Sequence, residues 1–237
     1  MRSLSSFLRK KIDRYLVAAG IVAEAVALPN GAIVSIATAL ASALTVTAAS
    51  NASECVLTVG NSLSAGDYVV FVSGWAKANN RVFRVKSPTG TNLVLEGFDT
   101  SNTTLFPASS GTGTIQKVNT WQQIQQVVDF TSSGGEPQYL TYSFLEQDYD
   151  TQIPTTTSAQ SIAFSIADDP TLAGYAAVKS AAQTRSATAL KVNMPQGGVV
   201  LYNGIFAFDE TPSMTKGQLM VCKGGIALQN RPVRYST

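Results

Sequence analysis

Three acidic residues at alternate positions are the strongest candidate for chemistry in this 237-residue chain. Glu146, Asp148 and Asp150 lie in the segment SFLEQDYDTQIP, and in an extended strand their side chains would share one face. Carboxylates gathered in this way can bind calcium or divide acid and base catalysis between them. The segment does not match a calcium-binding loop, because Thr151 occupies the position that requires glycine and Thr157 the position that requires a bidentate acid.

The rest of the composition argues against an enzyme. The chain has no histidine, which excludes Ser-His-Asp and Cys-His nucleophiles and every histidine-containing metal site. Cys55 and Cys222 are the only cysteines and lie far apart, so we expect two buried free thiols and no zinc site. The segment GTGTIQ lacks the third glycine of a dinucleotide-binding loop. A hydrolase built on paired carboxylates stays open in principle, but we expect no enzymatic activity, no cofactor and no metal.

The first 26 residues form a basic arm. They carry five basic and two acidic side chains, in a chain whose net charge is +2. Apolar residues recur there at helical spacing, at Leu4, Leu8, Ile12 and Tyr15, which predicts an amphipathic helix. We expect this helix to dock on its own domain or on a neighbouring subunit, with a membrane surface as the alternative. The basic side chains expected at the inter-subunit contact are Arg9, Lys10, Lys11 and Arg14.

A charge-free stretch follows the arm at residues 25–53. Its Pro-Asn-Gly turn and its many Ser and Thr residues argue against a transmembrane span, so we expect buried strands and no membrane. From residue 54, five short runs rich in Val, Leu and Phe alternate with turn residues and predict a small twisted barrel. These runs are ECVLTVG, DYVVFVSGW, NRVFRVKS, TNLVLEGFD and GTGTIQKV.

Longer predicted strands follow residue 117, with one helix among them. The segment TLAGYAAVKSAAQ predicts the helix, with Asp168 or Asp169 as its cap and Pro170 in its first turn. The fold class that follows is all-β, a β-sandwich or barrel with one or two packed helices and an inserted small β-barrel module. We place the arm at 1–26, the main domain at 27–44 and 118–237, and the inserted module at 45–117. The predicted strands are WQQIQQVVDF, QYLTYSFLEQ, SAQSIAFSIAD, ATALKVNMP, GGVVLYNGIFAF and GQLMVCKGGIAL.

A basic patch with two aromatic residues lies within the predicted module. Such a patch can follow a nucleic-acid backbone, or it can be the solvated face of a barrel whose aromatic side chains point inward. The patch consists of Lys77, Arg81, Arg84 and Lys86, with Trp75 and Phe83 between them.

Several separated motifs, taken in order, resemble the major tail tube proteins of long-tailed, lambda-like bacteriophages (siphoviruses). The resemblance covers residues 27–235, and the first 26 residues depart from the family pattern. The motifs that carry it are ALPNGA, VSGWAKANNRVFRV, EGFDTSNTTLFP, TSSGGEPQYLTY, QIPTTTSAQSIAFSIADDPTLAGYAAVKSA, YNGIFAFDETPSMTKGQLM and the terminal RPVRY.

The resemblance implies a structural virion protein that is assembled in the host cytoplasm and resides in the phage tail. Subunits of the family form hexameric rings whose sheets join around a lumen, and the rings stack into a tube that delivers genomic DNA. The implied partners are other copies of the chain and the tape measure and terminator proteins of the tail, and genomic DNA would pass through the lumen without sequence-specific binding. The alternative is a β-rich adhesion or carbohydrate-binding module.

Three placements follow from the resemblance. The inserted module would lie on the tube exterior, with its basic patch facing solvent or the host surface. The acidic cluster of Glu146, Asp148 and Asp150 would face either the lumen, where it repels DNA, or the next ring. Leu140, Tyr142 and Phe144 precede this cluster, and we expect them to lie in a packed region of the same strand.

Overall fold

The computed structural model describes residues 29–60 and 63–236. The predicted basic arm, with Arg9, Lys10, Lys11 and Arg14, lies outside the described residues. All described strands and the described helix belong to the compact unit of residues 31–237. The unit is mostly β-structure, as predicted, and within the described part no helix is long or apolar enough to cross a membrane.

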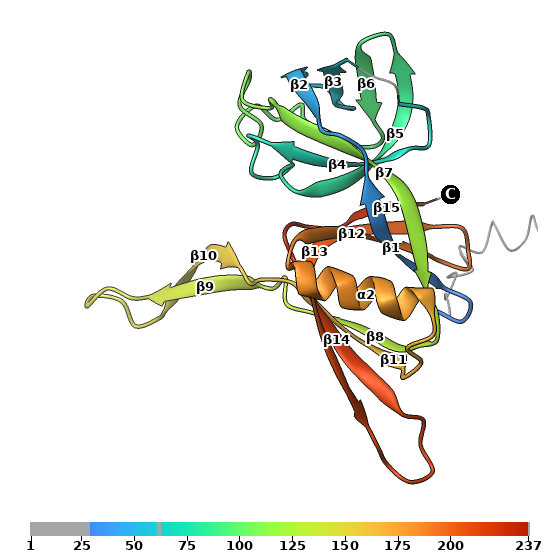
Figure 1. Cartoon of the computed structure of the whole chain (residues 1–237). Coiled ribbons are helices and arrows are strands. Elements are labelled where there is room, and N and C mark those ends of the chain that lie inside the picture. Colours follow the sequence, from blue (N-terminus) through green and yellow to red (C-terminus); the bar gives the residue numbers. More distant parts are fainter. Residues whose placement is uncertain (1–28, 61–62, 237) are drawn as a thin grey trace, which may run out of the picture. The chain divides into compact units, whose positions relative to one another are not determined.

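Six strands close into a small barrel, drawn from blue to green in Figure 1. Their order is β2-β3-β6-β5-β4-β7, and β7 pairs back to β2. Alternate Val, Leu and Phe side chains fill the interior, where Phe71, Phe83 and Ile115 are fully buried. The strands are β2 (Leu44–Ala49), β3 (Val56–Val59), β4 (Tyr68–Ser73), β5 (Arg81–Thr89), β6 (Asn92–Leu95) and β7 (Gly113–Ile124). The sequence predicted five of these strands; it placed residues 45–49 in the module without predicting β2 as a strand.

The remaining large sheet is antiparallel and has the order β7-β1-β12-β13-β14-β11-β8. The strand β7 belongs to both parts, because its first half pairs with β4 and β2 and its second half pairs with β1. The short β15 pairs with the start of β13. The strands are β1 (Ile33–Leu40), β8 (Val127–Ser133), β11 (Ser161–Ala167), β12 (Ala187–Asn193), β13 (Val199–Ser213), β14 (Val221–Leu228) and β15 (Val233–Tyr235).

The helix α2 (Ala173–Thr184) covers one face of this sheet (Figure 1). Its buried side chains Tyr175 and Val178 pack in one core with Ile36 and Phe206 of the sheet. Gly174 lets the helix approach closely, because a Cβ atom there would lie 2.5 Å from the Gln123 carbonyl oxygen.

The predicted helix cap is wrong. The N-cap residue is Leu172, and no side chain caps the helix. The carboxylate of Asp169 instead accepts hydrogen bonds from the backbone N–H and the hydroxyl of Thr171, which forms a turn ahead of the helix. The peptide carbonyl of Asp169 also accepts the Leu172 N–H, so Asp169 and Pro170 precede the helix.

Two predicted strands also end earlier than expected. The segment WQQIQQVVDF is divided between β7 and β8, because the chain turns at Gln126, whose φ is 57°. The segment QYLTYSFLEQ is a strand only as far as Tyr142, in β9 (Pro137–Tyr142). It pairs with β10 (Thr151–Thr157) as a separate two-stranded sheet (Figure 1).

Both cysteines are free and buried, as predicted. Cys55 lies in the barrel core and Cys222 in the core beneath α2. Burial raises the pKa of the Cys55 thiol to about 11, so this thiol stays protonated near neutral pH.

Candidate assembly surfaces

The acidic cluster lies in the loop between β9 and β10, not in a strand. Residues 143–150 form this loop, which we call the hairpin tip, and the Gln147 N–H donates to the Phe144 carbonyl oxygen at 3.0 Å. Glu146, Asp148 and Asp150 are exposed, and none of them forms an ion pair within the described part of the chain. The single strand face suggested by their alternate spacing is therefore absent. No group of acidic or cysteine side chains in residues 29–60 and 63–236 is arranged to hold a metal ion.

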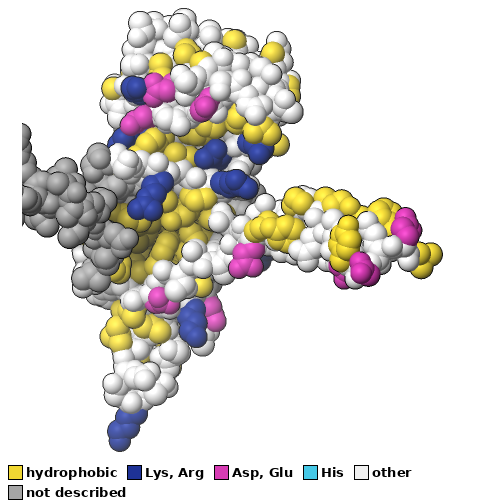
Figure 2. Space-filling model, turned by 180° about the vertical axis from the view of Figure 1, so that it is seen from behind, with side chains coloured by type: hydrophobic (Ala, Val, Ile, Leu, Met, Phe, Trp, Pro, Cys, Tyr) yellow, Lys and Arg dark blue, Asp and Glu magenta, His cyan; other side chains and the backbone are white. Residues whose placement is uncertain are grey.

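The hairpin that carries the tip exposes large hydrophobic side chains. The expectation that Leu140 and Phe144 belong to a packed region is wrong, because they are 58% and 56% exposed, and Leu145 is fully exposed. Figure 2 shows hydrophobic and acidic side chains side by side along this hairpin. Exposed apolar patches of this kind mark surfaces that bind another molecule. The exposed hydrophobic residues of the hairpin are Tyr139, Leu140, Phe144, Leu145, Tyr149 and Ile153.

The hairpin is joined to the main sheet through two glycines. Gly134 and Gly135 have φ values of 79° and 83°, a conformation that glycine adopts without strain. A Cβ atom at Gly134 would lie 2.0 Å from the Ala159 carbonyl oxygen, so the two ends of the hairpin meet tightly. The Ser158 N–H donates to the Glu136 carbonyl oxygen at 2.9 Å and closes the base.

Four strands of the main sheet, β13-β14-β11-β8, are bounded by two open edges. The strand β8 pairs with β11 alone. In β13, Gly204 and Ile205 pair with β12 on one edge and with β14 on the other. Beyond Ile205 the strand β12 has ended, so residues 206–213 have no strand partner on that edge among the described residues. Open edges carry unpaired N–H and C=O groups that can pair with another chain.

A groove runs beside the open edge of β13. It lies between this strand and the last turns of α2, and its lining includes Phe206, Phe208 and Arg185. Lys179 also lines it and pairs with Glu210 at 2.7 Å. The groove therefore combines apolar and basic side chains next to unpaired backbone.

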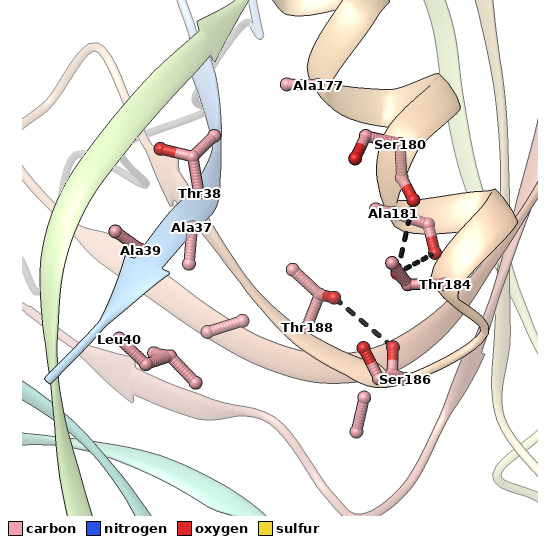
Figure 3. Close-up of a pocket in the computed structure, with 12 residues that line it drawn as sticks. Ala37, Thr38, Ala39, Leu40, Ala177, Ser180, Ala181, Thr184, Ser186 and Thr188 are labelled. Carbon is pink, nitrogen blue, oxygen red and sulfur yellow. Dashed lines mark hydrogen bonds between the residues drawn. The ribbon is translucent and has the colours of Figure 1, made fainter. Parts of the chain in front are cut away.

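A second, smaller cavity lies where β1 and β12 separate (Figure 3). The two strands pair only as far as Ile36 and Leu190, and α2 closes the gap between their diverging ends. We call this cavity the fork pocket. It is lined by residues 37–40 of β1, by residues 186–189, and by Ala177, Ser180, Ala181 and Thr184 of α2.

The predicted basic patch is only partly a surface feature. Lys77 and Lys86 are exposed, and Lys86 pairs with Glu54 at 2.7 Å. Arg81 and Arg84 are half-buried, which corrects the expectation of one exposed patch. Trp75 and Phe83 point into the barrel and are 1% and 0% exposed, as the barrel-face alternative required.

Arg81 and Arg84 connect the barrel to the C-terminal segment. The Arg84 guanidinium pairs with Glu96 and lies 4.5 Å from the ring centroid of Tyr235. The backbone N–H of Arg84 donates to the Tyr235 hydroxyl oxygen at 2.8 Å, and the Arg81 guanidinium donates to the Pro232 carbonyl oxygen at 3.4 Å. These two arginines therefore hold structural contacts and are not free to bind phosphate groups.

Sequence reasoning missed the open edges and both cavities. The open edges depend on which strands pair with one another, and the residue types of a strand do not indicate its pairing partners. The Arg-Pro-Val-Arg-Tyr segment at residues 231–235 lies far along the chain from the basic patch, so the sequence gave no sign that Tyr235 contacts Arg84.

The chain was compared with known proteins. A family model described as phage tail tube protein, TTP, matches residues 73–237, which is more than half of the chain. The search of curated proteins found no match.

Proposed function

Because this chain belongs to the phage tail tube protein family, we propose that its copies form stacked hexameric rings and so build the conduit for genome delivery. Its role is structural, and its place is the tail of the virion. The observation that best supports ring formation is the pair of open edges that bound strands β13-β14-β11-β8.

The strand directions fit a closed ring. All three pairings within the four strands are antiparallel, so β8 runs opposite to β13. The β13 of a neighbouring copy can then lie beside β8 as one more antiparallel partner, and the same step repeats around the ring. Closure satisfies every edge that would otherwise invite uncontrolled pairing.

One apolar side chain of β8 is free to meet a neighbouring copy. Phe130 pairs opposite Phe164, which is buried in the α2 core, so Phe130 projects on the helix side of the sheet. Phe130 packs against this core within its own copy, with its ring centroid 6.4 Å from that of Tyr202, so the apolar surface that the β8 edge offers to a neighbour lies elsewhere on the strand. Val128 is 58% exposed and provides this surface.

The face of the four strands opposite α2 suits a lumen wall. Apart from Ile205 and Val221, its uncharged side chains are small or hydroxylated, and its three charges are Asp129, Asp209 and Lys223, which leave it slightly acidic. Such a wall releases few counterions and so gives DNA little to bind. The small side chains of this face are Thr131, Ser133, Ser161, Ala163, Ser165, Ala207, Gly225 and Ala227.

We propose the remaining placements from the resemblance and from family membership. The inserted module, residues 45–117, would lie on the tube exterior, and the arm of residues 1–26 would dock between subunits. Tape measure and terminator proteins would be the other tail partners, and assembly would take place in the host cytoplasm. A β-rich adhesion or carbohydrate-binding module is the competing function, and glycan-array binding by a chain that does not assemble would favour it.

Electron microscopy of the purified protein, with one matched pair of variants, tests the proposal. Val128 pairs with no residue of β11, because the register shifts there, so Val128→Lys should spare the fold while placing a charge at the neighbour contact. We expect rings and tubes from the wild type and from Val72→Lys, a control at a 41% exposed valine of the barrel, but none from Val128→Lys. A wild type that stays monomeric at high concentration with tail initiators present would overturn the proposal.

A further inference from the structure

Two groups of exposed apolar side chains stand out on the described surface. The first lies on the β9–β10 hairpin, where Leu145 at the tip is fully exposed and Phe144 is 56% exposed. The second lies in the loop between β13 and β14, residues 214–220, where Met214 is 74% exposed and Leu219 is 63% exposed. The other exposed large apolar residues of the described part occur singly along the chain, which is usual for a protein surface. The two groups therefore lack cover within their own copy.

The apolar side chains of the hairpin share one face. Leu140 pairs directly opposite Ile153, and Tyr142 lies on the same face because side chains alternate along a strand. The ring of Phe144 packs edge-on against Tyr142, with ring centroids 5.5 Å apart, and extends this face to the hairpin tip. No residue from 131 to 161 is buried, and a hairpin of two strands is only marginally stable in water on its own. This face gains stability if another surface covers it.

The β13–β14 loop presents a lysine among apolar side chains. The Gln218 N–H donates to the Thr215 carbonyl oxygen at 3.0 Å, and Gly217 has a φ of 83°. Lys216 and Gly217 therefore occupy the two central positions of a turn, with apolar residues on both sides of it. The exposed apolar residues that flank the turn are Met214, Leu219 and Met220.

The hairpin tip and the loop have opposite charge and matching apolar chemistry. Residues 144–150 contain three acidic side chains and no basic one, whereas residues 214–220 contain Lys216 and no acidic one. None of these four charged side chains forms an ion pair with a described residue. The loop supplies two methionines and the hairpin four aromatic rings, and methionine sulfur packs favourably against aromatic rings. Charge and apolar content both favour the loop as the surface that covers the hairpin.

Arg185 is a second basic side chain that lies beside apolar ones. It lines the groove next to β13, together with Phe206 and Phe208. In the proposed ring, the β8 of a neighbouring copy lies along this edge of β13 and covers the groove. The β13–β14 loop follows the last residue of β13, Ser213, and stays free for a further contact.

We propose that the apolar face of the β9–β10 hairpin in one copy packs against the β13–β14 loop of a second copy, with Lys216 next to the acidic side chains of the tip. The inference rests on the self-assembly proposed above and names the residues of one contact in it. Hairpin and loop are different patches on the same chain, so the contact is heterologous and can propagate from copy to copy instead of closing a dimer.

Cysteine cross-linking in assembled tubes tests the contact directly. Cys55 and Cys222 are buried and give no background on mild oxidation. We expect a mixture of Leu145→Cys and Leu219→Cys chains to give a covalent dimer that links residues 145 and 219, and neither variant alone to give a dimer. The matched control is a mixture of Leu145→Cys with Leu105→Cys, a 44% exposed leucine of the β6–β7 loop, from which we expect no dimer.

Other pairings would overturn the proposal. A dimer of Leu145→Cys with Ala187→Cys would place the tip in the fork pocket, and one of Leu219→Cys with Leu8→Cys would give the loop to the N-terminal arm. An equal yield from the Leu105→Cys control would assign the link to random collision. Tubes that form with no link between residues 145 and 219 would reject this contact and leave the proposed function intact. A wild type that forms no tubes would count against both.

A charge exchange supplies the second readout. Lys216→Glu should raise the critical concentration for tube formation about two- to fivefold, as expected when an exposed ion pair is replaced by like charges. Adding Glu146→Lys and Asp148→Lys to the same chain should restore the wild-type value within about twofold. Lys77→Glu, at an exposed lysine of the barrel, is the control and should leave the value unchanged. An equal loss in this control, or a loss that the exchange does not relieve, would overturn the pairing of Lys216 with the tip.

Discussion

Gly224 lies in β14 directly over the aromatic ring of Phe164. A Cβ atom at Gly224 would lie 2.2 Å from the Phe164 Cζ atom, whereas one at the adjacent Gly225 would meet only the Ile162 carbonyl oxygen at 3.9 Å. Phe164 is buried against Phe206, with ring centroids 6.4 Å apart, so the ring has little room to move. The two neighbouring glycines therefore differ sharply in what they tolerate.

We predict that Gly224→Ala lowers the free energy of unfolding by about 1–3 kcal/mol, the usual effect of overpacking a core. Gly225→Ala should change it by less than about 0.5 kcal/mol, or raise it slightly by reducing the freedom of the unfolded chain. Urea denaturation of the two unassembled variants measures both values. Equal effects at the two positions would show that contact with Phe164 does not decide the outcome.

The ion pair between Arg84 and Glu96 makes stability depend on pH. Hydrogen bonding to Arg84 lowers the pKa of Glu96 below its ordinary value of 4.5. The pair therefore stabilises the fold above that value and loses its effect as the pH falls through the lowered pKa of the folded state. Both side chains keep more than a quarter of their surface exposed, so we expect only about 0.2–1 kcal/mol.

The variant Glu96→Gln tests this pH dependence. The difference in the free energy of unfolding between wild type and variant should be largest near pH 7 and should shrink below about pH 4.5. Urea denaturation from pH 7 to about pH 3 measures it. A difference that stays constant over this range would assign the effect of the substitution to packing instead of charge.

At the scale of elements, the β9–β10 hairpin is separable from the fold. It contributes no buried residue, and its base is closed by the hydrogen bond between Ser158 and Glu136. We predict that joining Glu136 directly to Ser158 lowers the free energy of unfolding by less than about 1 kcal/mol, since no core contact is lost. Circular dichroism and thermal unfolding measure this.

The same deletion should prevent tubes from forming, because it removes the exposed apolar surface of the tip. Electron microscopy would then show monomers or single rings. Tubes of normal length from the deleted chain would show that the hairpin has no part in stacking. A chain that fails to fold would instead show that the hairpin supports the sheet at its base.

The hairpin also shows what sequence reasoning can and cannot reach. Runs rich in Val, Leu and Phe correctly predicted the barrel strands from Val56 onward, and the segment after Pro170 correctly predicted the helix, because the apolar residues of these elements fill a core within the chain. In QYLTYSFLEQ, apolar residues of the same types do not fill a core. Leu140 and Phe144 are exposed, and a pattern of apolar residues does not tell a core from a surface meant for another molecule.

Other differences have local causes. The strand β2 was not predicted as a barrel strand because Leu44–Ala49 lies in a charge-free stretch and ends in two alanines, a residue type that is depleted in strands. Asp169 was expected to cap α2, yet its carboxylate is engaged by Thr171. The family was predicted from motifs spread along the chain and is confirmed by the family model. The acidic cluster was predicted at the water-facing end of a strand that continues into a polar loop; the cluster is exposed, and the loop begins earlier, at residue 143.

At the scale of the whole molecule, the proposed tube would have the face opposite α2 as the wall of its lumen. We predict that Thr131→Lys combined with Ala227→Lys, both exposed on that face, leaves tube formation intact and makes the lumen retain DNA. Each lysine adds a phosphate contact whose strength falls as salt rises. The repeated copies of a ring multiply this effect.

Nuclease protection of short duplex DNA during assembly measures the retention. Protected DNA should increase at low salt for the lysine variant and return to the wild-type level at high salt. Thr45→Lys with Ala48→Lys, two exposed positions of the barrel strand β2, is the matched control. If both double variants protected the same amount of DNA, the face opposite α2 would not be the lumen wall.

The strand β7 has a consequence for engineering, because one continuous strand belongs to both the barrel and the main sheet. An epitope or enzyme could be inserted at Gly90, in the turn between β5 and β6. The barrel that carries this turn is connected to the sheet by β7 and by the contact between Arg84 and Tyr235. Every copy in a filament would then present its cargo in the same orientation. The chain is in this sense a ready scaffold for periodic display, with a spacing set by the filament lattice and not by a flexible linker.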